Sequence, residues 1–82
     1  MQYQVEINVM PLKELLDPQG KAVEQSLNNL SIPTSNVRVG KRIELKVEAA
    51  SKEDAFELVE NACKKLLYNP VMEFYKINIS EI

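Results

Sequence analysis

Two segments of the chain alternate apolar and polar side chains with a period of two residues. This alternation is the pattern of a β-strand that buries one face and exposes the other. The apolar positions are Tyr3, Val5, Ile7 and Val9 in the first segment and Tyr75, Ile77 and Ile79 in the second. The pattern therefore predicts a strand at each end of the sequence.

The middle of the chain carries the same alternation, but across a glycine. Its odd positions are apolar: Val37, Val39, Ile43, Leu45 and Val47. One interpretation is a single long strand bent by a bulge at Gly40-Lys41, and the other is a hairpin with residues 40–42 as a three-residue loop. A two-residue turn is excluded, because it would place Val39 opposite Arg42 and turn Glu44 inward.

A helix is predicted after the first strand and a short linker through Leu16. Asp17 is a capping residue type, and Pro18 suits the first helical position because its missing N–H is not needed there. Ala22, Val23, Leu27 and Leu30 then recur at helical spacing. Asn28, Asn29 and Ser31 before Ile32-Pro33 are stop signals, so we expect this helix over residues 18–31.

A second helix is predicted from Ser51, which resembles the first residue of a capping box with acidic residues behind it. Its apolar stripe consists of Ala55, Phe56, Leu58, Val59, Ala62, Cys63, Leu66 and Leu67. Asn69-Pro70 should end it. The order of elements is then β-α-β(β)-α-β.

This order predicts the α+β class: a two-layer sandwich, ferredoxin-like or a close relative, with two helices on one face of a small sheet. The 82 residues form a single domain, 1–82. A chain of this size buries only about 60% of its unfolded surface, so a second subunit would stabilise it. We therefore expect a homodimer or a tetramer.

Composition excludes several classes of chemistry. The chain has no His and only two Gly, which removes the commonest general base and zinc ligand and leaves no Gly-rich phosphate loop. We expect no catalytic residue, no metal site and no bound cofactor. The net charge of −2 gives no grip on nucleic acid or on a membrane. The first ten residues lack the apolar run of a signal peptide, and the lone Cys63 suits a reducing compartment, so we expect a cytoplasmic protein.

The predicted fold does not by itself explain some residues, and these residues form the candidate interface. Gly20 sits in the first helical turn, where glycine is unfavourable unless another backbone approaches closely. Met72 and Phe74 fall out of phase with the buried positions of the last strand, which sends them to its other face. The full candidate set is Asp17, Gly20, Arg38, Gly40, Lys41, Arg42, Asn69, Pro70, Met72 and Phe74. Most also have structural interpretations as caps, turns or solvated charges, and an anion-binding role for the basic cluster Arg38, Lys41 and Arg42 is the less favoured one.

Three blocks of the sequence resemble the PurS family, the small subunit of phosphoribosylformylglycinamidine synthase. They are LDPQGKAV at 16–23, VRVGKRIEL at 37–45 and KLLYNPVMEFY at 65–75. Each block alone is weak, but together they have the family's spacing and length. Tyr68 and Phe74 depart mildly from the family pattern, where a small and an acidic residue are common.

The resemblance implies a subunit without its own catalysis in an ATP- and glutamine-dependent ligase complex of de novo purine biosynthesis. In that family a PurL-type synthetase subunit uses ATP and Mg, a PurQ-type glutaminase subunit releases ammonia, and the small subunit bridges them and assists ammonia transfer. The lack of catalytic groups noted above agrees with this division of labour.

Two other classes of function agree less well with the sequence. A ferredoxin-like, ACT-type regulatory domain that binds a small effector would need a glycine-containing loop after the first strand, and residues 10–16 contain none. An RNA-binding sandwich would need aromatic residues on the open sheet face for base stacking. That face is expected to carry Gln4, Glu6, Asn8, Arg38 and Glu44 instead.

Overall fold

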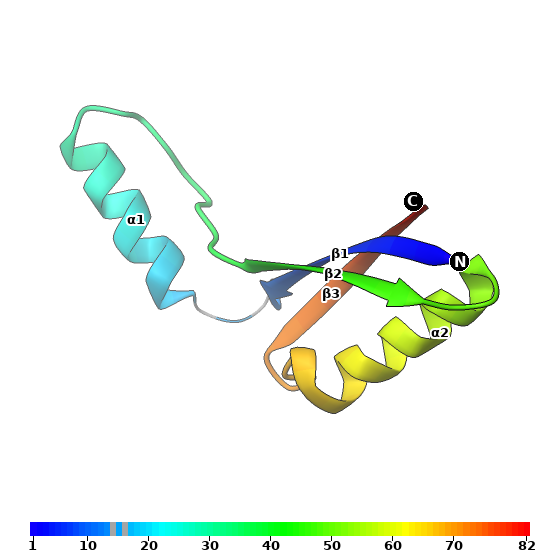
Figure 1. The fold of residues 1–82 in the computed structure, drawn as a ribbon. Coiled ribbons are helices and arrows are strands. Elements are labelled where there is room, and N and C mark those ends of the chain that lie inside the picture. Colours follow the sequence, from blue (N-terminus) through cyan, green and yellow to red (C-terminus); the bar gives the residue numbers. More distant parts are fainter. Residues whose placement is uncertain (14, 16) are drawn as a thin grey trace.

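A three-stranded antiparallel sheet forms the body of the molecule in the computed structural model, which describes residues 1–13, 15 and 17–82 (Figure 1). The strands are β1 (Gln2–Pro11), β2 (Lys41–Glu48) and β3 (Glu73–Glu81), in the spatial order β2-β1-β3. The strands predicted at the two ends of the sequence are confirmed. Leu16, where the predicted linker ends and the first PurS-like block begins, lies outside the described residues.

The register of the sheet places most apolar residues of the three strands on one face, while Met10 and Phe74 lie on the other. Val5 lies opposite Leu45 of β2 and Ile79 of β3. Because side chains alternate along each strand, the odd-numbered residues share a face and the even-numbered polar residues point to the other side. Only the odd-numbered face is therefore available for a hydrophobic core.

The second helix covers that apolar face. Helix α2 (Lys52–Ala62) continues into one π-helical turn, η1 (Cys63–Leu67), and ends before Asn69-Pro70 as predicted. The N-terminal cap is also as predicted, since Ser51 Oγ accepts a hydrogen bond from the Asp54 N–H at 3.1 Å. The core consists of Val5, Ile7, Val9, Val59 and Cys63.

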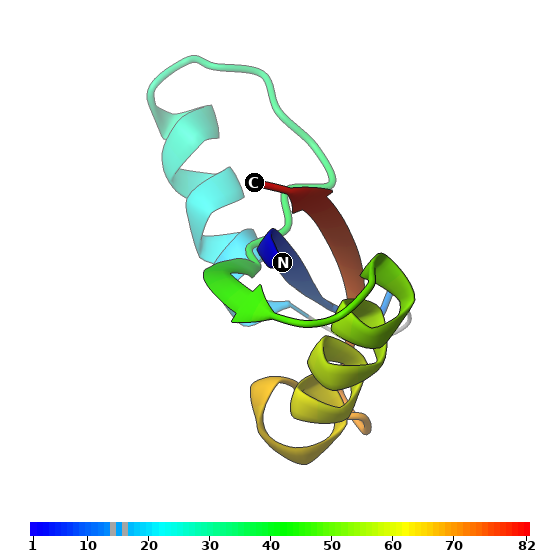
Figure 2. The same ribbon diagram turned by 45° about the vertical axis from the view of Figure 1, so that its right-hand side comes forward.

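The first helix is in a different place from the one predicted. Helix α1 (Pro18–Asn29) does not lie beside α2 on the sheet; it projects from the end of β1, and the two views agree on this (Figures 1 and 2). The chain is accordingly elongated, with extents of 50 × 27 × 14 Å. The α+β class and the order of elements are confirmed, but the expectation that both helices cover one face is wrong for this single chain. The helix also ends two residues before the predicted Ser31, which adopts a left-handed φ of 64°.

The structure of residues 37–40 decides between the bent strand and the hairpin that the sequence left open. The strand begins at Lys41, and residues 37–40 form no strand, so the hairpin is wrong and the long strand exists only in its second half. Residues 37–39 instead run beside the N-terminal half of α1, where the Val37 and Val39 N–H groups donate to side chains of the helix and its cap. Hydrogen bonds to α1 therefore replace the strand pairing that the pattern predicted.

No helix among the described residues is long and apolar enough to span a bilayer.

Candidate interaction surface at the α1 end of the sheet

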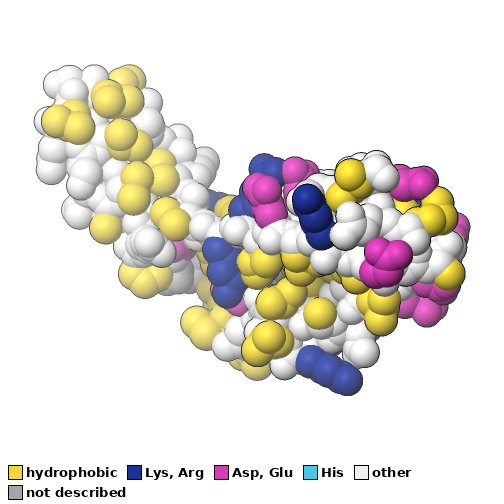
Figure 3. Space-filling model, in the orientation of Figure 1, with side chains coloured by type: hydrophobic (Ala, Val, Ile, Leu, Met, Phe, Trp, Pro, Cys, Tyr) yellow, Lys and Arg dark blue, Asp and Glu magenta, His cyan; other side chains and the backbone are white. Residues whose placement is uncertain are grey.

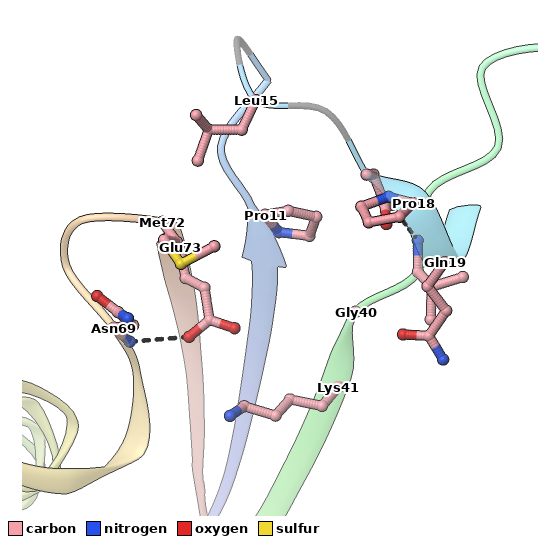
Figure 4. A pocket seen from close by; sticks show the side chains of 11 residues that line it. Pro11, Leu15, Pro18, Gln19, Gly40, Lys41, Asn69, Met72 and Glu73 are labelled. Carbon is pink, nitrogen blue, oxygen red and sulfur yellow. Dashed lines mark hydrogen bonds between the residues drawn. The ribbon is translucent and has the colours of Figure 1, made fainter. Parts of the chain in front are cut away.

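A cleft of about 400 Å³ opens where α1 leaves the sheet (Figure 4). Three segments that are distant in sequence form its walls: the end of β1 with the start of α1, the start of β2, and the turn before β3. Five of the predicted interface residues line it: Asp17, Gly40, Lys41, Asn69 and Met72. The fold thus gathers half of the candidate set around one depression.

Asp17 fixes the geometry of this cleft through both of its carboxylate oxygens. One oxygen accepts from the Gly20 N–H at 3.0 Å and caps α1, as predicted, while the other accepts from the Val39 N–H at 2.9 Å. The hydrogen bond from Gly20, followed by the one from Val39 and the charge of Arg38, lowers the pKa of Asp17 below its usual value. A single side chain therefore joins the helix start to the segment that enters β2.

Gly20 is the buried residue of α1, and its place explains the glycine. A Cβ built there would lie 3.0 Å from the Cα of Arg38 and closer still to the carbonyl oxygen of Val37. The close approach of another backbone, inferred from the sequence, is thus made by this chain's own residues 37–38. Nearby, Glu24 accepts a hydrogen bond from the Val37 N–H at 3.1 Å.

The basic cluster of Arg38, Lys41 and Arg42 does not assemble into one anion site. The Arg38 guanidinium donates to the carbonyl oxygen of Pro11. Arg42 pairs with Glu6 and, at 3.1 Å, with Glu44 on the polar face of the sheet. Two of the three cations are therefore engaged with different partners, and Lys41 alone reaches the cleft (Figure 4).

The turn before β3 presents the other wall of the cleft. Asn69 stabilises this turn through two hydrogen bonds. Its backbone N–H donates to the Glu73 carboxylate at 2.8 Å, and its side-chain oxygen accepts from the Val71 N–H at 3.0 Å. The Leu12 N–H donates to the Met72 carbonyl oxygen at 2.9 Å and so attaches the turn to the end of β1. Pro70 belongs to the same turn and is exposed.

Met72 and Phe74 differ in their surroundings. Met72 is 54% exposed and lines the cleft. Phe74 lies opposite Met10 of β1 on the polar face of the sheet and is half-buried. Both side chains therefore lie outside the core, as expected, although other residues of the chain partly cover Phe74.

Sequence reasoning missed several residues of the cleft. Pro11, Leu15, Gln19, Val39 and Glu73 also line it. None of them breaks a periodic pattern, so only the pairing of the strands could reveal that they lie together. The strand-ending Pro11 was the one available signal, since proline is confined to the ends and edges of sheets.

The lining of the cleft combines apolar side chains with polar groups that already have hydrogen-bond partners. Proline, leucine, valine and methionine supply apolar contact, and Asp17 and Asn69 are already engaged in backbone hydrogen bonds. No group of three or more residues able to hold a metal ion occurs among residues 1–13, 15 and 17–82. Fold and cleft together describe a small α+β domain with a partly apolar depression at one end of its sheet.

Comparisons with known proteins identify the family within that class. The family model of PurS, described as phosphoribosylformylglycinamidine (FGAM) synthase, matches residues 4–81, and the chain belongs to this family. The PurS subunit of phosphoribosylformylglycinamidine synthase from Thermotoga maritima is 42% identical over 72 residues, covering 87% of this chain and 88% of that protein. Its counterpart from Bacillus subtilis is 37% identical over 81 residues, covering 98% and 95%.

Solved structures agree with these sequence relatives. The purS subunit from Thermotoga maritima has a TM-score of 0.91 at 37% identity and covers 98% of this chain and 93% of its own. The structure of PurLQS from Thermotoga maritima contains a chain with a TM-score of 0.91 at 37% identity, covering 98% and 99%. The resemblance seen in the three sequence blocks is confirmed.

Proposed function

We propose that this chain is the small, non-catalytic subunit of a phosphoribosylformylglycinamidine synthase complex in de novo purine biosynthesis. The observation that carries the proposal is the match to PurS subunits over almost the whole length of both partners. The PurLQS structure supports the assembly, because its small chain has nearly the same backbone as this one. The chain would join a PurL-type synthetase subunit and a PurQ-type glutaminase subunit.

Within that complex the chain would bridge its two partners and assist the transfer of ammonia between them. Its own residues support a bridging role over a chemical one, because the sequence contains no His and the thiol of Cys63 is buried. Burial also raises the pKa of that thiol, which disfavours the nucleophilic thiolate. ATP and Mg would be used by the synthetase subunit, in the cytoplasm.

The surface that would meet a partner is the cleft at the α1 end of the sheet. Met72 and the apolar walls provide contact area, and the engaged Asp17 and Asn69 hold the surface rigid. A preformed surface loses little conformational entropy when it binds, so a rigid cleft favours a stable complex. Homodimers or tetramers of the chain would present two or more such surfaces.

Purification of the complex from the source cell tests the proposal. The chain carrying an affinity tag should retain a synthetase and a glutaminase, identified by mass spectrometry, and the tag alone should retain neither. Met72→Lys should lower the yield of one or both partners, whereas Glu81→Lys, exposed at the far end of β3, should not. Recovery of neither partner under conditions that preserve the complex would contradict the proposed function.

A further inference from the structure

Two opposite charges face the cleft at the α1 end of the sheet from its two outer strands. Lys41 is the first residue of β2 and Glu73 the first residue of β3, and both line the cleft. Lys41 lies opposite Val9 and Glu73 opposite Pro11, so β1 runs between them. Both positions are odd-numbered and therefore on the same face of the sheet. Figure 4 shows the two side chains extending from β2 and β3 toward β1, so the cleft has a cation at one wall and an anion at the other.

Neither charge is neutralised within the described part of the chain. The ion pairs found among residues 1–13, 15 and 17–82 include the neighbouring Arg42, but neither Lys41 nor Glu73. Lys41 is exposed. Glu73 is half-buried, and the Asn69 N–H engages one of its carboxylate oxygens at 2.8 Å and so orients it. The two charges therefore depend on water, or on a partner, for compensation.

The surface between the two charges is apolar. Pro11, Leu15 and Met72 line the cleft, and Leu15 and Met72 are 39% and 54% exposed. Figure 3 shows basic and apolar groups at the surface where α1 meets the sheet. A partner that covers the cleft removes this apolar area from water, which favours binding. The same partner also removes Lys41 and Glu73 from water, and burial of a charge without a counter-charge opposes binding strongly. A partner therefore gains the apolar contact only if it brings charges of the opposite sign.

We propose that the cleft selects a partner segment that carries an acidic and a basic side chain on the two sides of an apolar one. The acidic side chain pairs with Lys41, the basic one pairs with Glu73, and the apolar one packs on Met72. The inference rests on the proposed function, because it names the chemistry of the segment that another subunit of the complex inserts into this cleft. Lys41 and Glu73 then determine which segment fits.

The positions of the two charges restrict the segment further. Two strand spacings and an offset of two residues along the strands place the Cα atoms of Lys41 and Glu73 on the order of 12 Å apart. Because the side chains extend toward β1 from both sides, one short segment can reach both. The order of the charges across the cleft is fixed, so a segment with its acidic and basic side chains exchanged meets like charges and is rejected.

Binding of the purified synthetase and glutaminase subunits to the chain, with ATP, Mg and glutamine present, tests the inference. Lys41→Glu should raise the dissociation constant for one of them about tenfold or more, because an attraction becomes a repulsion. Lys46→Glu is the matched control, since it makes the same change on β2 but on the exposed polar face of the sheet. This control should alter the constant less than about twofold.

Glu73 is tested by a change that keeps its hydrogen bond. Glu73→Gln retains an oxygen for the Asn69 N–H but removes the charge, and it should weaken binding of the same subunit that Lys41→Glu affects. Glu81→Lys, exposed at the far end of β3, should not. Ionic strength provides a readout that a merely structural role would not move. The dissociation constant of the parent should rise with salt more steeply than that of Glu73→Gln, because screening weakens only the charge contacts that are present.

The outcomes separate this inference from the proposed function. Circular dichroism verifies that each variant is folded. Unchanged binding of both subunits by Lys41→Glu and Glu73→Gln would overturn the inference and leave the proposed function intact. A loss of self-association in sedimentation, with unchanged binding of the other subunits, would also overturn it, because a second copy would then fill the cleft. A parent chain that binds neither subunit would overturn the proposed function and the inference together.

Discussion

Replacing Gly20 by alanine should loosen α1 although alanine is the better helix former. In an open helix this change stabilises by up to about 1 kcal/mol. At Gly20 the added Cβ would lie 2.6 Å from the Asp17 carboxylate and 3.0 Å from the Arg38 Cα, both inside ordinary contact distance. Forcing an extra carbon into packed backbone costs typically about 1–3 kcal/mol, and the backbone on the other side cannot rotate away as a side chain can. We therefore expect a net loss of about 1–2 kcal/mol from the attachment of α1.

Amide hydrogen exchange of α1 measures this loss directly. A loss of about 1.4 kcal/mol raises the exchange rate of amides protected by the attachment about tenfold, and the amides of α2 should not change. Ser26→Ala is the matched control, since this position is exposed on the same helix and alanine there should slow exchange slightly. If Gly20→Ala slowed exchange as the control does, the close approach of residues 37–38 to the helix would be refuted.

Three further results are expected. Phe74→Ala should weaken self-association or complex assembly about tenfold, while the chain still unfolds cooperatively. Its interface role would be contradicted if sedimentation showed unchanged association, or if the substitution greatly lowered the stability of the monomer itself. Because the folded-state pKa of Asp17 is lowered by Gly20 and Val39, its carboxylate stabilises the α1 attachment above the unfolded pKa of about 3.9, and this contribution should vanish as pH falls through the lower folded pKa. The NMR shifts of α1 should report this change, and Asp17→Asn should abolish it. Cys63, buried and with a raised pKa, should react with a thiol reagent only at the rate of unfolding, and prompt labelling of the native protein would contradict its burial.

Local patterns were sufficient wherever a segment packs against its neighbours in the same chain. The alternation around Val5 and Ile77 correctly predicted the first and the last strand of the chain. The Ser51 cap and the Asn69-Pro70 stop correctly predicted where the second helix begins and ends. In each case the side-chain pattern and the burial have the same period, so the sequence reports the structure directly.

The position of α1 could not be predicted in this way. A stripe such as Val23 and Leu27 shows that a helix has an apolar face, but it does not say which surface covers that face. Gly20 is informative, because a glycine in the first turn of a helix indicates that another backbone lies close to it. The alternation over Val37 and Val39 misled for a related reason, since residues with strand periodicity can satisfy their N–H groups with side chains of a helix as well as with a second strand.

The candidate surface was half predictable. Asp17 and Gly40 were found because capping and turn positions demand particular residue types. Glu73 and Leu15 carry no such demand. Glu73 reaches the cleft through the antiparallel pairing of β1 with β3, and Leu15 through the turn that follows β1. Long-range proximity of this kind depends on topology and leaves no trace in local periodicity.

Reconstitution of the synthase from separate subunits tests the central claim most directly. Glutamine-dependent formation of the amidine product should require this chain together with the synthetase and the glutaminase, while synthesis from added ammonia should proceed with the synthetase alone. The isolated chain should neither hydrolyse glutamine nor consume ATP. Turnover of either compound by the isolated chain, or full glutamine-dependent synthesis by the two partners without it, would contradict the account of this protein as a bridging subunit without catalysis of its own.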